Sequence, residues 1–142
     1  MIMFVDDEPR HMAPYVRQLT ESGLQVSFRE TVDDALDYIE ENPGAVQLLV
    51  LDIMMPPGRS FDSAQTRYGL DTGIRFFERV RRGSPDLPVI ILTNVTDEEA
   101  ARHFRAQPSC WFLRKRDYLP YELEQTIRDI LSKQRSKPGG DK

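Results

Sequence analysis

The sequence predicts an α/β fold in which helices cover both faces of a parallel sheet of five strands. Short apolar runs bounded by turn residues alternate with segments whose apolar residues recur at helical spacing, which is typical of such sheets. Asp6 and Asp7 directly follow the apolar run 1–5. Asp52 directly follows the apolar run 48–51. Because parallel strands point the same way, we expect these acids at one edge of the sheet, where open α/β sheets bind ligands.

The first half of the chain contains three expected strands and two expected helices. Residues 1–5 form an apolar run, and the helix of about a dozen residues after them ends before Gly23, a typical left-handed helix cap. Residues 25–29 alternate as in a strand. Thr31 is expected to cap a second helix. Residues 46–51 have the strongest strand pattern in the chain.

The second half of the chain continues the same alternation. A helix is expected over residues 73–82, where apolar side chains recur at helical spacing, and a strand over residues 87–92. Thr96 is expected to cap the next helix, because a glutamate three residues later completes a capping box. A fifth strand is expected at residues 111–113. Pro120 then begins the last helix, because proline suits the first turn.

Five β units thus alternate with five α units, which predicts right-handed crossovers and a doubly wound sheet. Sheets of this kind commonly have the strand order 2-1-3-4-5. Strands 1 and 3 are neighbours in that order, so Asp6, Asp7 and Asp52 should converge. We expect one domain over residues 1–131 and a disordered basic tail or linker remnant over residues 132–142.

Composition limits the classes of protein. The net charge of -4 and the isoelectric point near 5.2 predict no basic surface, so no direct contact with nucleic acid is expected. No apolar run approaches the about 18 residues of a membrane span, so no membrane contact is expected. The single cysteine, Cys110, excludes an intrachain disulfide and fits a reducing compartment, so we expect a cytoplasmic protein.

Three converging carboxylates need a counter-charge. Two carboxylates about 4 Å apart repel by roughly 4 kcal/mol at an effective dielectric constant of 20. Protonation relieves this repulsion, and so does a hard divalent cation; an all-oxygen site at an open sheet edge suits Mg²⁺. Thr93 and Lys115 end the fourth and fifth strands at the same edge, where they and a cation-loaded carboxylate form a cradle for a phosphoryl group. In the alternative interpretation, the acids only cap loops and turns.

These residues make the chain resemble the receiver domain of a two-component response regulator over residues 1–131. Residues 5–8 (VDDE) resemble the acidic pair of the family, and residues 51–56 (LDIMMP) resemble its phosphoacceptor strand end. Thr93 and Lys115 match its switch hydroxyl and its lysine. The four features occur in order on the expected strands. The resemblance implies the flavodoxin-like form of the doubly wound fold.

The resemblance implies roles for the acidic residues. Asp52 would be the phosphoacceptor, whose carboxylate takes a phosphoryl group from a phosphohistidine and becomes an acyl phosphate. Asp7, Asp52 and the backbone carbonyl of Met54 would bind Mg²⁺, and Asp6 would act on the ion mostly through water. The chain would be a signalling domain and not an enzyme, apart from catalysing its own phosphotransfer and slow dephosphorylation.

The resemblance also implies a switch. Lys115 would pair with the phosphoryl oxygens, and Thr93 would move to hydrogen-bond one of them. Phe112 occupies the position of the family's aromatic switch, which swings inward when the Thr93 hydroxyl is drawn to phosphate; a simple core position is the alternative. The fourth helix, fifth strand and fifth helix would form the face that changes partners.

The partners implied by the resemblance lie on both sides of the phosphorelay. A sensor histidine kinase or a histidine phosphotransfer protein would donate the phosphoryl group. A downstream protein or a covalently linked output domain would read the phosphorylated state. A homodimer is a further possibility.

An insertion departs from the family pattern. Residues 57–72 add roughly a dozen residues after the phosphoacceptor strand, and they form either a lid over the site or a surface loop. Arg59 or Arg67 is a candidate to reach the phosphoryl group or the acids. Phe61 or Tyr68 is a candidate to pack over the opening.

Two single positions depart as well. Arg116 stands where the family generally has proline after the lysine, so the usual cis peptide is expected to be missing there. Asn94, after the switch hydroxyl, is larger than the usual residue and would crowd the approach to Asp52. Slower phosphotransfer or hydrolysis follows as a hypothesis. These departures slightly favour the alternative of a pseudo-receiver, a constitutive protein-interaction module that is not phosphorylated. The complete set of Asp6, Asp7, Asp52, Thr93 and Lys115 argues for phosphorylation instead.

Two enzyme-like or cofactor-binding classes fit the sequence poorly. A haloacid-dehalogenase phosphatase would need a second aspartate two residues after the nucleophile, where Met54 follows Asp52. A flavodoxin-like cofactor binder would need a phosphate loop of Ser, Thr and Gly after the first strand. Residues 7–10 (DEPR) stand there instead.

Overall fold

The computed structural model describes residues 1–56, 58–60, 72–95 and 97–136. At its centre lies one parallel sheet in the order β2-β1-β3-β4-β5, which confirms the predicted fold class and strand order. The strands are β1 (Ile2–Val5), β2 (Val26–Arg29), β3 (Leu48–Leu51), β4 (Val89–Thr93) and β5 (Cys110–Arg114).

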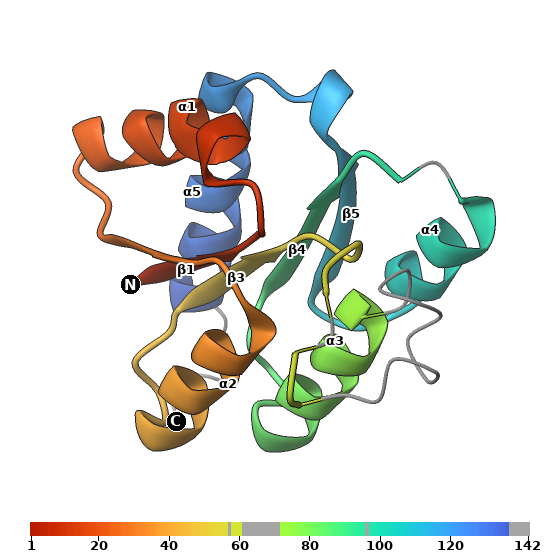
Figure 1. Cartoon of the computed structure of the whole chain (residues 1–142). Helices are drawn as coiled ribbons and strands as arrows, with labels where there is room; N and C mark the ends of the chain where they lie inside the picture. Colours follow the sequence, from red (N-terminus) through yellow and green to blue (C-terminus); the bar gives the residue numbers. More distant parts are fainter. Residues whose placement is uncertain (57, 61–71, 96, 137–142) are drawn as a thin grey trace.

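Helices connect the strands and cover both faces of the sheet. The helices are α1 (Pro9–Glu21), α2 (Val32–Glu41), α3 (Thr72–Gly83), α4 (Glu98–Arg105) and α5 (Pro120–Ser136). Figure 1 shows α1 beside α5 on one face, and α2 beside α3 on the other. A short 3-10 turn, η1 (Lys115–Asp117), lies between β5 and α5. In the described part of the chain, none of the helices has the length and apolar character needed to cross a membrane.

The sheet separates two apolar cores. Met3 and Val5 of β1 belong to the core shared with α2, α3 and α4. Ile2 and Phe4 belong to the core shared with α1 and α5. Because successive side chains of a strand point to opposite faces, a strand with helices on both faces must be apolar throughout. This explains why β1 and β3 are unbroken apolar runs and why β4 is apolar up to Thr93, whereas the half-buried β2 alternates.

The helix caps agree with the sequence analysis at two positions and differ at one. The Thr31 hydroxyl accepts a backbone N–H of the first turn of α2 at 3.1 Å, and Gly23 has a φ of 99° after α1. Asp97, and not Thr96, caps α4, since its carboxylate accepts the N–H of Glu99 at 2.9 Å. Thr96 itself lies outside the described residues. Aspartate is as good a cap as threonine, and it stands one position closer to the helix.

Several element boundaries also differ from those expected. β3 begins at Leu48 and not at residue 46, and β4 begins at Val89 and not at residue 87. α5 continues to Ser136, so the first part of the expected tail, residues 132–136, is helical. Lysine, glutamine and arginine favour a helical backbone even where the apolar periodicity has ended, so the periodic pattern underestimates the length of α5. Residues 137–142 lie outside the described part of the chain.

Gly73, in the first turn of α3, allows the helix to approach the segment after β3 closely. Its N–H donates to the carbonyl of Ile53 at 3.0 Å. A Cβ atom at this position would lie only 2.2 Å from the Ile53 Cα. Because this contact is with backbone, a side-chain rotation cannot relieve it. Ile53 directly follows Asp52, so this contact fixes the position of the segment that bears the acid.

Replacing Gly73 with alanine should therefore destabilise the fold. The clash forces α3 away from Ile53 at a cost of about 1–3 kcal/mol in the free energy of unfolding, although alanine is the better helix former. Gly83→Ala is the matched control, because no atom outside its neighbours lies within 4 Å of the new Cβ. Urea unfolding measures both variants, and equal stabilities would contradict the close approach.

Candidate functional site

Asp6 and Asp52 lie side by side because the hydrogen-bond ladder of the sheet runs one residue beyond the strands. Val5 pairs with Leu51 in the register of β1 and β3. The N–H of Asp52 donates to the carbonyl of Val5 at 3.1 Å, and the N–H of Asp6 donates to the carbonyl of Arg29 at 3.1 Å. Both acids therefore lie at the carboxyl edge of the sheet, where the strand order predicts them.

Lys115 reaches both acids from the end of β5. Its Nζ lies 3.0 Å from Asp6 Oδ2 and 3.3 Å from Asp52 Oδ2. The three side chains are only 10%, 2% and 8% exposed, for Lys115, Asp6 and Asp52, so water screens these ion pairs weakly. Charges buried to this extent are tolerated only when they are paired and hydrogen-bonded.

The second carboxylate oxygen of Asp52 is held by two other donors. The buried hydroxyl of Thr93, the last residue of β4, donates to Asp52 Oδ1 at 2.7 Å. The N–H of Met54 donates to the same oxygen at 3.2 Å. The Thr93 hydroxyl oxygen accepts the N–H of Val95 at 3.2 Å, which orients the hydroxyl hydrogen toward the carboxylate. Asp52 is thus fixed by a hydroxyl, an amide and an ammonium.

The site holds more negative than positive charge, and burial together with neighbouring charges shifts the pKa values of its groups. Burial raises the pKa of Asp6 above its usual value; Lys115 opposes the rise and Asp52 adds to it. Burial also raises the pKa of Asp7, with repulsion from Asp52 and Glu8 in the same direction. Burial alone would lower the pKa of Lys115, but attraction to Asp52 and Asp6 raises it above its usual value. An added cation would therefore be stabilised here.

A tighter acidic group follows β1. Carboxylate oxygens of Asp6, Asp7 and Glu8 lie within 4.8 Å of one another. Asp52 is not in that group, whereas the buried Asp6 belongs both to it and to the pair on Lys115; the other two members, Asp7 and Glu8, are exposed. Sequence reasoning assigns no role to Glu8. The signal that could have found it is the run of three acids directly after a strand.

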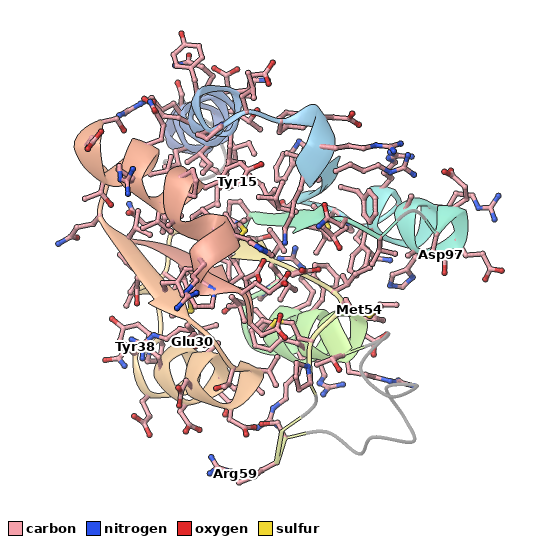
Figure 2. The ribbon with its side chains drawn as sticks, turned by 45° about the horizontal axis from the view of Figure 1, so that its top comes forward. Tyr15, Glu30, Tyr38, Met54, Arg59 and Asp97 are labelled. Carbon is pink, nitrogen blue, oxygen red and sulfur yellow. The ribbon has the colours of Figure 1, made fainter. Side chains whose placement is uncertain are left out.

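An open hollow of about 480 Å³ leads to Asp52. Met54, half exposed, lines it on the segment after β3, and Asp97 lines it from the start of α4 (Figure 2). Asn94 lines it as well, beside Thr93. The expectation that Asn94 obstructs the approach to Asp52 stays a prediction.

Phe112 is a core residue in this structure. It is 6% exposed and belongs to the core under α4. Its ring stacks on that of Phe104, with centroids 6.3 Å apart. The guanidinium of Arg105 lies over the Phe112 ring, 5.5 Å from its centroid. The side chain is thus inward while the Thr93 hydroxyl contacts Asp52.

Arg59 does not reach the acids of the site. Its N–H and that of Ser60 each donate to the carboxylate of Asp33 at 2.9 Å, and its guanidinium lies 3.8 Å from the same group. Its side chain is 81% exposed, and Figure 2 shows it at the edge of the molecule, away from Met54. Asp33, in the first turn of α2, holds this segment instead. Arg67, Phe61 and Tyr68 lie outside the described residues, as do most of residues 57–72.

Comparison with known proteins gives one family. The model of the response regulator receiver domain matches residues 2–128. Among curated proteins, the chain is similar to the sensor kinase CckA of Brucella abortus, with 27% identity over 136 residues. The match covers 94% of this chain but only 13% of that kinase, so the chain spans a small part of the relative's length.

Solved structures share the fold. A response regulator receiver domain protein from Clostridium thermocellum has a TM-score of 0.74 at 20% identity, with 94% of this chain and 95% of that chain covered. A CheY-like receiver domain protein from Methanospirillum hungatei also gives 0.74 at 20% identity, with 96% of each chain covered. The receiver domain of NtrX from Brucella abortus gives 0.72 at 22% identity, with 93% and 98% covered.

Replacing Asp7 with asparagine should stabilise the fold at neutral pH when divalent cations are absent. The folded-state pKa of Asp7 is raised, so the folded protein holds this proton more tightly than the unfolded chain. Stability therefore falls as pH rises from about 3.8 through the folded-state pKa, and the loss persists above that range. Removing the charge of Asp7 should raise the free energy of unfolding by about 0.5–1 kcal/mol, a value reduced for solvent screening.

Urea unfolding in EDTA between pH 4 and pH 8 tests this expectation. The gain in the free energy of unfolding of Asp7→Asn over wild type should shrink as the pH is lowered, because wild-type Asp7 then becomes neutral as well. Asp129→Asn, at an exposed position of α5, is the matched control. A gain that is the same at both ends of the range would contradict the charge-based account.

Proposed function

Because the chain belongs to the family of response regulator receiver domains, we propose that it acts in two-component phosphorelay signalling by accepting a phosphoryl group on Asp52. The observation that supports this most strongly is the shared contact of Asp52 with Lys115 and Thr93, at 3.3 Å and 2.7 Å. A carboxylate held in this way at an open hollow is oriented, accessible and close to donors for incoming phosphoryl oxygens.

The proposed chemistry is transfer from a phosphohistidine. A carboxylate oxygen of Asp52 bonds to phosphorus while the bond from phosphorus to the histidine nitrogen breaks, and the imidazole leaves. Lys115 already lies between Asp6 and Asp52, so its ammonium can pair with the phosphoryl oxygens by a small movement. Thr93 can turn its hydroxyl from Asp52 to one of these oxygens.

The donor set at this edge fits Mg²⁺. The available ligand atoms are oxygens, which Mg²⁺ prefers, and the loop acids Asp7 and Glu8 are exposed. The carboxylates are more numerous than the one positive charge, on Lys115, that can balance them. We assign the binding of the ion to Asp7, Asp52 and the backbone carbonyl of Met54, with Asp6 acting mostly through water. The ion would neutralise charge on the phosphoryl group, as in other phosphoryl transfers.

The proposed output is a change at the face formed by α4, β5 and α5. Thr93 in β4 pairs with Arg114 in β5. A movement of the Thr93 hydroxyl would therefore occur beside β5, the strand that bears Phe112. Phe112 packs inward under α4 in the present structure. We assign Thr93 and Phe112 as the two switch residues, whose positions together set the surface presented to a partner.

The proposed partners follow from the family. A sensor histidine kinase or a histidine phosphotransfer protein supplies the phosphoryl group, and a downstream protein or a covalently linked output domain responds to it. The similarity of this chain to a segment of a sensor kinase supports the proposal that its phosphoryl donor is such a kinase. A homodimer is a further form in which the output could act.

Exposure to acetyl phosphate and Mg²⁺ should add one phosphoryl group to the protein. Intact mass measures the gain, which should be absent in Asp52→Asn because the nucleophilic carboxylate is missing. Asp37→Asn, an exposed acid on α2, is the matched control and should gain mass as wild type does. Wild-type protein that stays unmodified would favour the pseudo-receiver, which acts without phosphorylation.

Replacing Asn94 with alanine should accelerate both gain and loss of the phosphoryl group. The smaller side chain opens the hollow beside Thr93, and a rate increase of roughly three- to tenfold corresponds to about 0.7–1.4 kcal/mol of barrier. The decay of phosphorylated protein after removal of the donor gives the rate of loss. Unchanged rates would show that Asn94 does not obstruct the approach to Asp52.

A further inference from the structure

Tyr15 of α1 contacts both ends of the turn that bears Lys115. Its hydroxyl lies 2.7 Å from the backbone carbonyl oxygen of Tyr118 and 3.2 Å from that of Lys115. One hydroxyl hydrogen serves the shorter contact best and the longer one only partly. These two carbonyls bracket η1, so a single side chain of α1 holds the turn at its start and at its end (Figure 2).

The turn has other contacts at its two ends, where Arg114 pairs with Glu98 at 2.8 Å and the Leu119 N–H donates to the Glu122 carboxylate at 2.7 Å. Within it, the N–H of Tyr118 donates to the carbonyl of Lys115 at the long distance of 3.3 Å. Arg116 follows Lys115 without a proline ring to fix its φ angle. As Arg116 led us to expect, the described part of the chain contains no cis peptide bond. The Tyr15 hydroxyl thus joins this turn to α1, mainly through the Tyr118 carbonyl and partly through the Lys115 carbonyl.

Tyr15 itself is buried. It is 9% exposed and shares the buried face of α1 with Met12 and Leu19. Burial raises the pKa of its hydroxyl, against the opposing effect of Lys115, so the hydroxyl stays protonated as a donor at neutral pH. α1 begins at Pro9, directly after the acidic group, and packs along α5. It therefore links the acidic loop at its start to the Lys115 turn at Tyr15.

The position of Lys115 matters because its ammonium must reach two carboxylates at once. Its Nζ lies within 3.3 Å of both Asp6 and Asp52. A displacement of the backbone by about 1 Å would break one of these contacts, and misplacements of that size reduce rates of group transfer by up to roughly 100-fold.

We propose that Tyr15 is a positioning residue for Lys115: its hydroxyl fixes the backbone turn after β5 and so holds the Lys115 ammonium on Asp6 and Asp52. The consequence for phosphotransfer rests on the proposed function, whereas the consequence for the Lys115 contacts does not. The hydrogen bonds of the Tyr15 hydroxyl go to the Lys115 and Tyr118 carbonyls, and not to the phosphoacceptor or to the residues assigned to Mg²⁺. Its loss should change the rate of phosphorylation without changing the affinity for Mg²⁺.

Tyr15→Phe tests the first consequence, because it keeps the buried ring and removes only the hydroxyl. The matched control is Tyr38→Phe, on α2 at the opposite face of the sheet. The readout is the ¹H–¹⁵N signal of the Lys115 ammonium, assigned by its loss in Lys115→Met. Its exchange with water should increase severalfold in Tyr15→Phe and stay at the wild-type rate in Tyr38→Phe. Urea unfolding confirms that both variants are folded under the conditions used.

Phosphorylation by acetyl phosphate tests the second consequence. The rate at saturating Mg²⁺ should fall by roughly tenfold in Tyr15→Phe, while the Mg²⁺ concentration that gives half of the maximal rate stays as in wild type. A general loosening of the site would change both quantities together. Tyr38→Phe should leave both unchanged.

The outcomes separate this inference from the proposed function. Wild-type protein that is never phosphorylated, together with faster Lys115 exchange in Tyr15→Phe, would reject the function and support the positioning role. An unchanged Lys115 exchange rate in Tyr15→Phe would overturn the positioning role, whatever the phosphorylation assay shows. A parallel change in rate and Mg²⁺ dependence would overturn it as well, in favour of a purely structural role.

Discussion

The structure of the site depends on one shared ion pair, in which the Lys115 ammonium contacts Asp6 and Asp52 together. Both carboxylates are buried, and neither could stay ionised there without a bonded counter-charge. One ammonium cannot neutralise two carboxylates with Asp7 beside them, so the site remains electrostatically unsatisfied. The same contact therefore stabilises the folded site and leaves it ready for a cation and an anionic group.

The fold supplies this contact through its strand order. β1 and β3 are neighbours, which brings two acids far apart in the sequence into register, while β4 and β5 place a hydroxyl and an ammonium at the same edge. Backbone contacts outside the sheet hold the loops that follow. Gly73 packs closely against the segment after β3, and the Tyr15 hydroxyl donates a hydrogen bond to the turn after β5. Packing far from Asp52 thus determines its surroundings.

Much of this arrangement could be predicted from the sequence, because apolar runs and strand order are local and topological properties. The convergence of Asp6, Asp52 and Lys115 follows from where strands end. The division between the buried pair and the loop acids could not be predicted, since it depends on side-chain direction within a few ångströms. The contact of Tyr15 with the Lys115 turn joins segments about 100 residues apart and has no sequence signal. The end of α5 was predicted too early, because residues of high helix propensity continue beyond the last residue of the apolar pattern.

A double-mutant cycle between Asp6 and Lys115 tests the central contact most directly. Lys115→Met alone should lower the free energy of unfolding by about 3–5 kcal/mol, because it leaves buried carboxylates unpaired. Combined with Asp6→Asn, the loss should be smaller than the sum of the single losses by at least about 1 kcal/mol. Single effects that add to within about 0.5 kcal/mol would show that the two side chains do not interact, and the account of the site would be wrong.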